Sequence, residues 1–295
     1  MARDLKRILG DGLRTDEPMS KHTTIGVGGA ARVLAIPSTM RQVGKIVSYA
    51  NRRGLTYAVV GKGSNLIVRD GGYDGMIVKM GAQLSKVKVN KTTVSAQGGA
   101  SFALLSRKMT KMGRTGLEFG IGIPGTVGGA VRMNAGAFGG EVKDVLRRAR
   151  IVDRDGEEHV LKPEDIRFSY RRSHLPKGSV VLSATFSCPP GNINEEAYRR
   201  SLGRKETQPI WERTFGSTFV NPEGAYAAEM IEKCGLKGMR RGGAMISDMH
   251  ANFIVNKGGE ARAKDVEALI RLMQREVKKK FGVVLKTEVV IIGNR

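Results

Sequence analysis

The sequence predicts a mixed α+β protein in which short apolar strands and amphipathic helices are interspersed along the chain. Three observations lead to this prediction. Helical stretches carry apolar residues at i, i+3, i+4 and i+7, strand-like runs are short and rich in Val, Ile and Leu, and residues 119–142 hold eight glycines. Glycine weakens helices and strands alike, so this density marks backbone that must come close to something else.

The first elements form a strand–helix–strand unit. Residues 33–37 predict a strand, and Ser38 is expected to cap a helix that ends at Gly54 and buries Val43, Ile46, Val47 and Ala50. Residues 57–60 predict the next strand, which leads directly into Gly61-Lys62-Gly63-Ser64-Asn65. A glycine loop after such a unit is a suitable context for binding phosphate.

The middle of the chain continues the same mixture. The pattern predicts strands at 76–79, 92–96 and 180–186, a helix at 101–112, and a hairpin of 150–153 with 159–161 around Asp155-Gly156. Cys188-Pro189-Pro190-Gly191-Asn192 is the clearest candidate boundary.

Beyond this boundary we expect a second part that contains three helices and a last strand. The spacing predicts helices at 194–206, 225–234 and 261–281, and a last strand at 285–292. On the helix at 225–234, Cys234 shares a face with Ala227, Met230 and Ile231, so it is interpreted as a small core residue.

The composition favours a binder of anionic small molecules. Fifty Lys and Arg against 28 Asp and Glu give a net charge of +22, but the basic residues come as scattered doublets without a nucleic-acid motif. A basic nucleic-acid-binding protein stays an alternative. No run has the length of a membrane span or signal peptide, so a soluble cytoplasmic protein is expected.

Neither the cysteines nor the histidines suggest a metal. The two cysteines are far apart without a CxxC pattern, and the four histidines lack metal-ligand spacing. We therefore expect no metal and no disulfide framework.

Gly120-Ile-Gly122-Ile-Pro-Gly125 matches the dinucleotide fingerprint GxGxxG literally, so a Rossmann domain must be considered. The context disfavours it: residues 114–119 do not resemble a buried parallel strand, and Gly128-Gly129 would cost a following helix about 1 kcal/mol each. The sequence contains no Walker A pattern and no GxSxG elbow.

Taken together, ordered segments from about His22 to Gly293 resemble the UDP-N-acetylenolpyruvoylglucosamine reductase family, flavoenzymes that make UDP-N-acetylmuramate for peptidoglycan. The segments are Lys21-His-Thr-Thr24 with Gly28-Gly29, Gly61–Leu66, Gly122–Ala130, Asn134–Ala137, Ser169–Ser173, Gly216-Ser-Thr-Phe219 with Asn221-Pro222, Gly235–Gly238, Gly242–Ala244, His250–Asn256 and Glu288–Gly293.

The resemblance implies an FAD-binding module of the vanillyl-alcohol-oxidase (PCMH) type with two α+β lobes, followed by a C-terminal α+β substrate domain. We place the module at residues 1–190, split near 80–90, and the substrate domain at 195–295. The chain resembles the shorter form of the family, which lacks the insertion that places a tyrosine over the uridine. It departs from the family pattern at Arg213-Thr214-Phe215, where a small Pro-Ser-Ala-like approach to the serine is expected.

The resemblance also implies the site. FAD would be held by Gly61, Lys62, Gly63, Ser64, Asn65, Gly122, Ile123, Pro124, Gly125, Thr126, Gly129, Ala130, Ala135 and Gly136. The catalytic residues would be Ser217, Arg171 and Glu288, and the substrate-binding residues Asn221, Lys205 and Tyr170.

By family position NADPH reduces FAD, hydride then passes to the enolpyruvyl group, and Ser217 supplies the proton. Arg171 and Glu288 would lie at the substrate carboxylate, where Glu288 helps only if it is protonated or bridged by a donor. The expected partners are the UDP-sugar and NADPH, and we expect a monomer. A flavin oxidase or dehydrogenase acting on another alcohol is the rival within flavoproteins.

Overall fold

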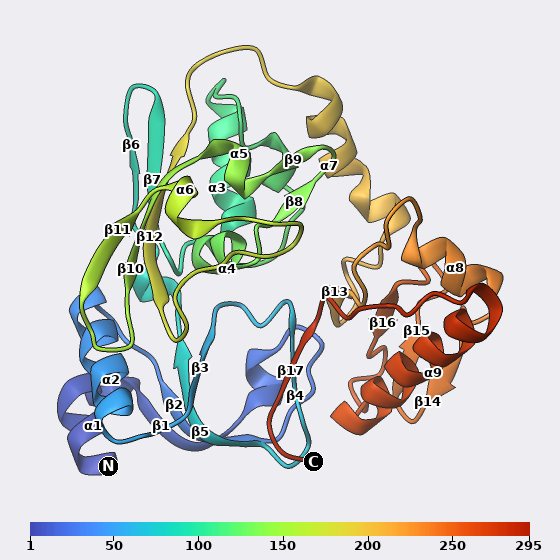
Figure 1. Cartoon of the computed structure of the whole chain (residues 1–295), viewed down its shortest axis with the longest axis horizontal. Helices are drawn as coiled ribbons and strands as arrows, with labels where there is room; N and C mark the ends of the chain where they lie inside the picture. Colours follow the sequence, from blue (N-terminus) through green and yellow to red (C-terminus); the bar gives the residue numbers. More distant parts are fainter. The chain divides into compact units, whose positions relative to one another are not determined.

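The computed structural model describes all residues, 1–295, which divide into two compact units (Figure 1). Unit 1 contains residues 1–16, 32–62 and 75–203, and unit 2 contains residues 17–31, 63–74 and 204–295. Each unit is therefore assembled from separate stretches of chain. The linear boundaries expected at 190–195 and near 80–90 stay predictions, while the contacts place the last change of unit between Gly203 and Arg204.

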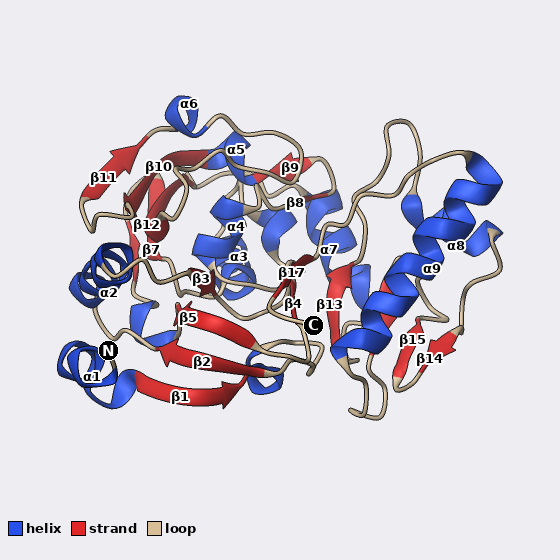
Figure 2. Cartoon of the chain, turned by 60° about the horizontal axis from the view of Figure 1, so that its bottom comes forward, coloured by secondary structure: helices blue, strands red, loops and turns tan.

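A four-stranded sheet and two helices form the first layer pair. The sheet has the order β1 (Leu13–Pro18), β2 (Ala30–Ala35), β5 (Tyr73–Lys79), β3 (Tyr57–Val60), and β5 and β3 are parallel (Figure 2). Helices α1 (Ala2–Leu9) and α2 (Met40–Arg52) share a buried cluster with these strands, which includes the stripe expected on α2.

The predicted cap of α2 is wrong by one residue. Thr39, not Ser38, is the N-cap: its hydroxyl accepts a hydrogen bond from the Gln42 amide (3.2 Å). The Gln42 side chain in turn accepts from the amides of Ser38 (2.7 Å) and Thr39 (3.3 Å), which completes a capping box.

A five-stranded sheet forms the rest of the core of unit 1. Its order is β11 (Glu158–Leu161), β10 (Leu146–Val152), β12 (Val180–Ser187), β7 (Thr93–Gln97), β6 (Val87–Val89), with all neighbours antiparallel. The predicted hairpin is confirmed, with Val152 opposite Glu158. Helices α3 (Phe102–Lys111) and α4 (Val127–Arg132) share a buried cluster with this sheet, centred on Phe102 and Phe186.

Short elements complete this part of the chain. They are β8 (Gly136–Ala137), β9 (Gly140–Glu141), α5 (Val142–Val145) and α6 (Pro163–Ile166), followed by α7 (Glu195–Thr207). The chain before Gly120 forms a 3₁₀ turn at Glu118–Gly120 and not a strand, so the GxGxxG match does not lie in a Rossmann unit.

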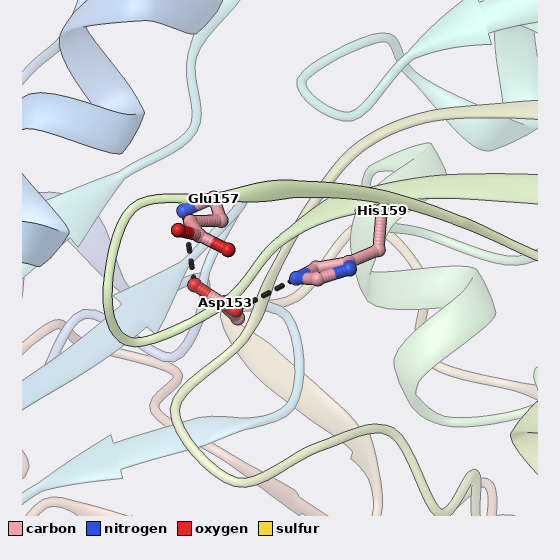
Figure 3. Close-up of side chains that lie close together, drawn as sticks. All are labelled: Asp153, Glu157 and His159. Atoms are coloured by element: carbon pink, nitrogen blue, oxygen red, sulfur yellow. Dashed lines mark hydrogen bonds and ion pairs between the residues drawn. The ribbon is translucent and has the colours of Figure 1, made fainter.

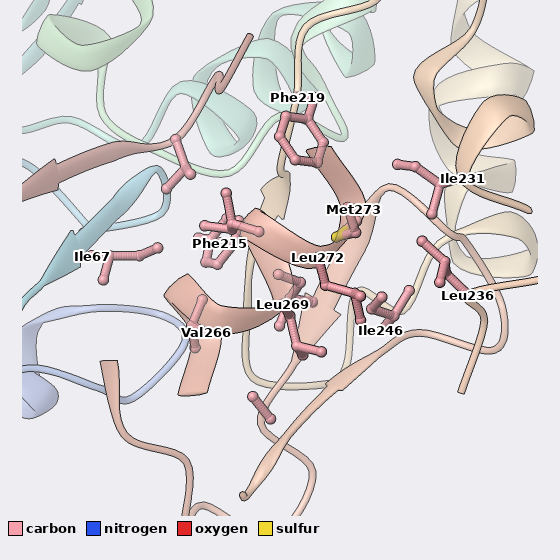
Figure 4. Packing of buried hydrophobic residues seen from close by; sticks show 14 of the residues in the cluster. Ile67, Phe215, Phe219, Ile231, Leu236, Ile246, Val266, Leu269, Leu272 and Met273 are labelled. Atoms are coloured by element: carbon pink, nitrogen blue, oxygen red, sulfur yellow. The ribbon is translucent and has the colours of Figure 1, made fainter. Parts of the chain in front are cut away.

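Unit 2 packs two helices on a small sheet. The sheet has the order β13 (Thr214–Ser217), β16 (Phe253–Val255), β15 (Ala244–Ile246), β14 (Arg240–Arg241). Figure 4 shows the core between this sheet and α9 (Ala263–Phe281), which also includes Ile231 of α8 (Ala227–Lys233). Cys234 packs against this cluster as predicted.

The predicted last strand is shorter than expected. Only β17 (Val290–Ile292) is regular, and it pairs in parallel with β4 (Leu66–Val68). Ile67 of β4 belongs to the core of unit 2, so the chain directly after the Gly61–Asn65 loop is fixed inside this unit.

Candidate active site

The Gly61–Asn65 loop is glycine-rich because neighbouring atoms leave no room for a Cβ. A Cβ on Gly61 would lie 2.4 Å from the Thr126 hydroxyl oxygen, within unit 1. Gly63, in unit 2, has φ +70°, and a Cβ there would lie 2.1 Å from the His22 carbonyl oxygen. Both contacts are far below van der Waals distance, so the bare backbone is required at these two positions.

Two lysines accompany this loop in unit 1. The Lys62 ammonium donates to the Ser101 hydroxyl (3.0 Å), and the Lys79 ammonium lies 3.5 Å from the Gly61 carbonyl oxygen. Lys79 is opposite Val60 at the carboxyl ends of the parallel strands β5 and β3, the usual place for ligands in such sheets. Burial lowers the pKa of Lys79, as expected for a cation removed from water before an anion arrives.

Within the segment 122–137, the amides at the start of α4 are bonded to the protein itself. At the start of α4, the amide of Val127 donates to the Ala100 carbonyl (2.8 Å) and that of Gly128 to the Gly98 carbonyl (2.9 Å). The Gly129 amide donates to the Thr126 hydroxyl (3.3 Å), and the Ala130 amide to the Thr126 carbonyl (2.8 Å). These amides are committed inside the protein.

Packing explains part of the glycine density in the same segment. A Cβ on Gly120 would lie 2.3 Å from the hydroxyl oxygen of Ser106 on α3, and a Cβ on Gly140 would lie 2.8 Å from the Phe119 ring. Gly125 has φ +141°, which also favours glycine. The residues around Gly61 therefore fit a cofactor diphosphate better than the amides of α4 do, and the cofactor contacts of Gly129 and Ala130 stay predictions.

Arg171 lies against the Gly136 strand in unit 1. It has φ +56°, its guanidinium carbon is 4.8 Å from the centre of the Tyr170 ring, and a Cβ on Gly136 would lie 3.1 Å from its Nη1. Tyr170 is mostly exposed. The structure therefore brings together the predicted residues Gly136, Tyr170 and Arg171.

Asn134 organises this corner, a role that the sequence did not reveal. It is fully buried with φ +44°, and its amide nitrogen donates to the carbonyl of Ser169 (3.1 Å) and to the carboxylate of Glu141 (2.8 Å). Its amide oxygen accepts from the Lys143 backbone (3.0 Å). One buried side chain thus connects the segment before Gly136 to the turn that carries Arg171.

Ser217 and Glu288 lie on neighbouring segments of unit 2. Gly216, with φ +86°, interrupts the pairing of β13 with β16, so the register shifts between Thr214 and Ser217. The Glu288 amide donates to the Thr218 carbonyl (2.9 Å), and Asn65 donates from its side chain to the Glu288 carbonyl (3.1 Å). Two predicted catalytic residues and the end of the predicted cofactor loop are therefore adjacent.

Asn252 clamps the strand that carries Ser217. Its side-chain oxygen accepts from the Phe219 amide (3.0 Å), its side-chain nitrogen donates to the Phe219 carbonyl (2.8 Å), and its backbone carbonyl accepts from the Thr218 amide (2.8 Å). Asn252 is only 4% exposed. These hydrogen bonds replace the strand pairing that is lost at the Gly216 bulge. The sequence around Asn252 did not predict this role.

The other predicted substrate residues have plain surroundings. Asn221 accepts a hydrogen bond from the Ala227 amide (3.1 Å) with its side-chain oxygen and so helps to begin α8, and Lys205 is exposed on α7. Their roles toward a substrate stay predictions.

One group of side chains has the composition of a metal site. Asp153, Glu157 and His159 come together on the β10–β11 hairpin, with potential ligand atoms within 4.8 Å of one another (Figure 3). The Asp153 carboxylate already accepts from the amides of Asp155 (2.9 Å) and Glu157 (3.0 Å) and contacts the His159 ring (2.7 Å). Burial alone would raise the pKa of Asp153, but these hydrogen bonds hold it below its usual range. The three side chains are therefore explained by their role in stabilising the turn.

Comparisons with known proteins match both halves of the chain. Residues 31–162 match a model of an FAD binding domain, and residues 208–292 match the C-terminal domain of UDP-N-acetylenolpyruvoylglucosamine reductase. None of the helices combines the length and apolar character needed to cross a membrane.

Relatives of the same description cover almost the whole chain. The UDP-N-acetylenolpyruvoylglucosamine reductase of Clostridium botulinum (strain 657 / Type Ba4) is 43% identical over 94% of this chain and 92% of its own length. That of Bacillus pumilus is 42% identical over 94% and 93%.

A solved structure agrees with both. The UDP-N-acetylenolpyruvylglucosamine reductase of Thermus caldophilus superposes with a TM-score of 0.82 and 34% identity, covering 95% of this chain and 99% of that one. The predicted fold class, an FAD-binding module of the vanillyl-alcohol-oxidase (PCMH) type with a C-terminal domain, is thereby confirmed. The chain belongs to the UDP-N-acetylenolpyruvoylglucosamine reductase family and is an FAD-dependent oxidoreductase of peptidoglycan precursor synthesis.

Proposed function

We propose that the enzyme uses NADPH to reduce the enolpyruvyl group of UDP-N-acetylglucosamine enolpyruvate to UDP-N-acetylmuramate, with Ser217 as the proton donor. Bound FAD supplies the hydride, which it has taken from NADPH. The residues of this chain must then do three things: hold the cofactor diphosphate, stabilise the charge that forms on the substrate, and deliver one proton.

The loop around Gly61 is proposed to hold the FAD diphosphate. Protein atoms fill the space beside Gly61 and Gly63, so the loop has a bare, fixed backbone. The Lys79 ammonium lies 3.5 Å from the Gly61 carbonyl oxygen, and the Lys62 ammonium lies at the Ser101 hydroxyl. Positive charge near bare peptide groups is the usual environment of a bound diphosphate.

Ser217 is proposed to give its hydroxyl proton to the carbon that bears the substrate carboxylate. Hydride addition to the terminal vinyl carbon leaves negative charge on this adjacent carbon and its carboxylate, and the proton completes the saturated product. Arg171 would stabilise the charge on the carboxylate. Glu288 would contribute as a protonated or donor-bridged group, because a bare carboxylate repels the charge that forms.

The observation that carries the assignment is the pairing of the Thr218 and Glu288 segments at 2.9 Å, directly beside the Gly216 bulge that presents Ser217. We propose Asn221, Lys205 and Tyr170 as contacts of the UDP-sugar, and a monomer acting in the cytoplasm, where nucleotide sugars and NADPH are available.

The test separates the two half-reactions in Ser217→Ala. NADPH should still bleach the flavin of this variant, whereas reoxidation by the enolpyruvyl substrate should slow by roughly 10²–10⁴-fold, as for a lost acid catalyst. Ser179→Ala is a matched control, since Ser179 is a turn residue whose hydroxyl donates to the Pro176 carbonyl (2.7 Å). Unimpaired reoxidation in Ser217→Ala would remove Ser217 from this role.

A further inference from the structure

A polar pocket in unit 2 is not used by the proposed chemistry. It has a volume of about 470 Å³ and is lined by Ser20, Lys21, Thr23, Thr24, Gly26, Arg213 and Gly259. We infer that this pocket binds the 2′-phosphate of NADPH and thereby selects NADPH over NADH. The inference rests on the proposed function, because it requires NADPH as the reductant.

Two glycines make room for the Arg213 side chain. Gly259 has φ +78°, and a Cβ there would lie 2.7 Å from the Nη1 of Arg213. Gly26 has φ +73°, and a Cβ there would lie 3.3 Å from the Arg213 Cδ. The turns at Gly26 and Gly259 therefore lie against the exposed Arg213 side chain.

Asn256 connects the two turns beside Arg213. It is fully buried, and its side chain donates to the Ile25 carbonyl (3.0 Å) and accepts from the Ala261 amide (3.0 Å). Its backbone amide donates to the Arg213 carbonyl (2.9 Å). The turn at Gly26, the turn at Gly259 and the backbone of Arg213 are thus fixed by one residue, and the pocket is preformed.

The charges in the pocket call for an anion. Lys21 and Arg213 line the same cavity, and neither forms an ion pair with a carboxylate. Ser20 adds a hydroxyl group, whereas the Thr24 hydroxyl already donates to the Thr214 carbonyl (2.6 Å). A guanidinium binds phosphate oxygens in a two-pronged manner, and an ammonium adds a point charge, so a phosphate monoester matches this set.

The position along the chain connects the pocket with the proposed reaction centre. Arg213 directly precedes β13, which ends at Ser217, and a strand advances about 3.3 Å per residue. The Thr24 amide donates to the Gly63 carbonyl (3.1 Å), so the pocket and the cofactor loop share a wall. When the nicotinamide of NADPH lies at the flavin, the 2′-phosphate on its adenosine ribose must lie away from the flavin, at the other end of the molecule.

The sites proposed for FAD and the UDP-sugar leave the phosphates of NADPH to be placed. The FAD diphosphate is proposed at Gly61–Asn65, and the UDP-sugar diphosphate at Asn221 and Lys205. The diphosphate and the 2′-phosphate of NADPH are the anionic groups that these sites leave without a partner. We assign the 2′-phosphate to the pocket because it is the monoester of the two and the group that distinguishes NADPH from NADH.

The first experiment measures binding without turnover. Isothermal titration of the oxidised, FAD-loaded protein with adenosine 2′,5′-bisphosphate and with adenosine 5′-monophosphate compares ligands that differ only in the 2′-phosphate. The wild type should prefer the bisphosphate, and Arg213→Met should weaken its binding by roughly 10–100-fold, as expected for a lost charged hydrogen bond. Arg240→Met, at an exposed arginine of β14, is the matched control and should leave the preference unchanged.

The second experiment measures flavin bleaching by NADPH and by NADH. Arg213→Met should raise the KM for NADPH and lower the ratio of kcat/KM for NADPH to that for NADH. Lys21→Met, at an exposed residue, gives a second variant that keeps the fold and should lower the same ratio. A wild-type flavin that NADPH does not bleach would refute the proposed function itself.

With bleaching intact, three results would overturn the pocket assignment. The first is equal binding of the two adenosine ligands by the wild type. The second is an unchanged ratio of kcat/KM for NADPH to that for NADH in Arg213→Met. The third is that Arg213→Met raises only the KM of the UDP-sugar or the dissociation constant of FAD. The last result would identify the pocket as a site for a diphosphate of one of those ligands.

Discussion

The Asn252 clamp leads to a prediction that joins stability to catalysis. Asn252→Ala leaves the amide and the carbonyl of Phe219 without partners, and Phe219 is only 1% exposed. Each unpaired buried backbone group costs about 1–3 kcal/mol, so the loss of two should lower the free energy of unfolding by about 2–6 kcal/mol. Urea unfolding followed by circular dichroism measures this loss, with the m-value as a check on the denatured state.

Gln274→Ala is a matched control because it removes a single hydrogen bond, from the Gln274 side chain to the Leu285 carbonyl (2.9 Å). It should cost about half as much as Asn252→Ala. Asn252→Asp keeps the acceptor for the Phe219 amide but buries a carboxylate oxygen against the Phe219 carbonyl, so it should cost at least as much as Asn252→Ala.

The catalytic readout distinguishes a positioning residue from a structural one. Because Asn252 holds Thr218 and Phe219 directly after Ser217, its loss should slow flavin reoxidation by the substrate more than flavin reduction by NADPH. Stopped-flow absorbance of the flavin measures both steps. Equal slowing of the two half-reactions, or a stability loss below about 1 kcal/mol, would refute the reasoning.

Two further predictions concern buried titratable groups. Lys79→Met should raise the dissociation constant of FAD by roughly tenfold in fluorescence titrations of the apoprotein, while Lys86→Met, at an exposed residue, should not. Burial lowers the pKa of Lys79, so as the pH rises the wild-type affinity for FAD should decline at a lower pH than it would with an exposed lysine. Unchanged affinity would separate Lys79 from the cofactor. Iodoacetamide at pH 8 should modify Cys234 well before Cys188, because burial raises the pKa of the fully buried Cys188 thiol to about 11 and the thiolate is the nucleophile; mass spectrometry of the labelled peptides would contradict this if Cys188 reacted first.

Much of the fold could be predicted from local patterns. The strand at 57–60 and the hairpin around Asp155-Gly156 follow from short-range rules, and the long helix α9 follows from its apolar periodicity and from Gly282 at its end. Local patterns do not reveal pairings between distant segments, so the sequence did not predict that β17 pairs with β4 or that unit 2 takes residues from three stretches of chain.

The site was predictable in a similar way. The glycine loops were visible in the sequence, but their physical reason was only partly foreseen, since Gly120 is required by Ser106 and the amides of α4 serve the protein itself. Asn134, Asn252 and Asn256 each connect segments that are distant in sequence, and a single buried amide leaves no periodic signature.

The parallel pair of β4 and β17 has a consequence for synthesis on the ribosome. Arg69 donates a hydrogen bond to the Gly293 carbonyl, 224 residues later, and the Val290 amide donates to the Asn65 carbonyl (3.1 Å). A nascent chain that has not yet released residues 290–293 therefore lacks the anchor behind the cofactor loop. We expect such a chain to retain flavin poorly, so that cofactor loading follows translation of this segment.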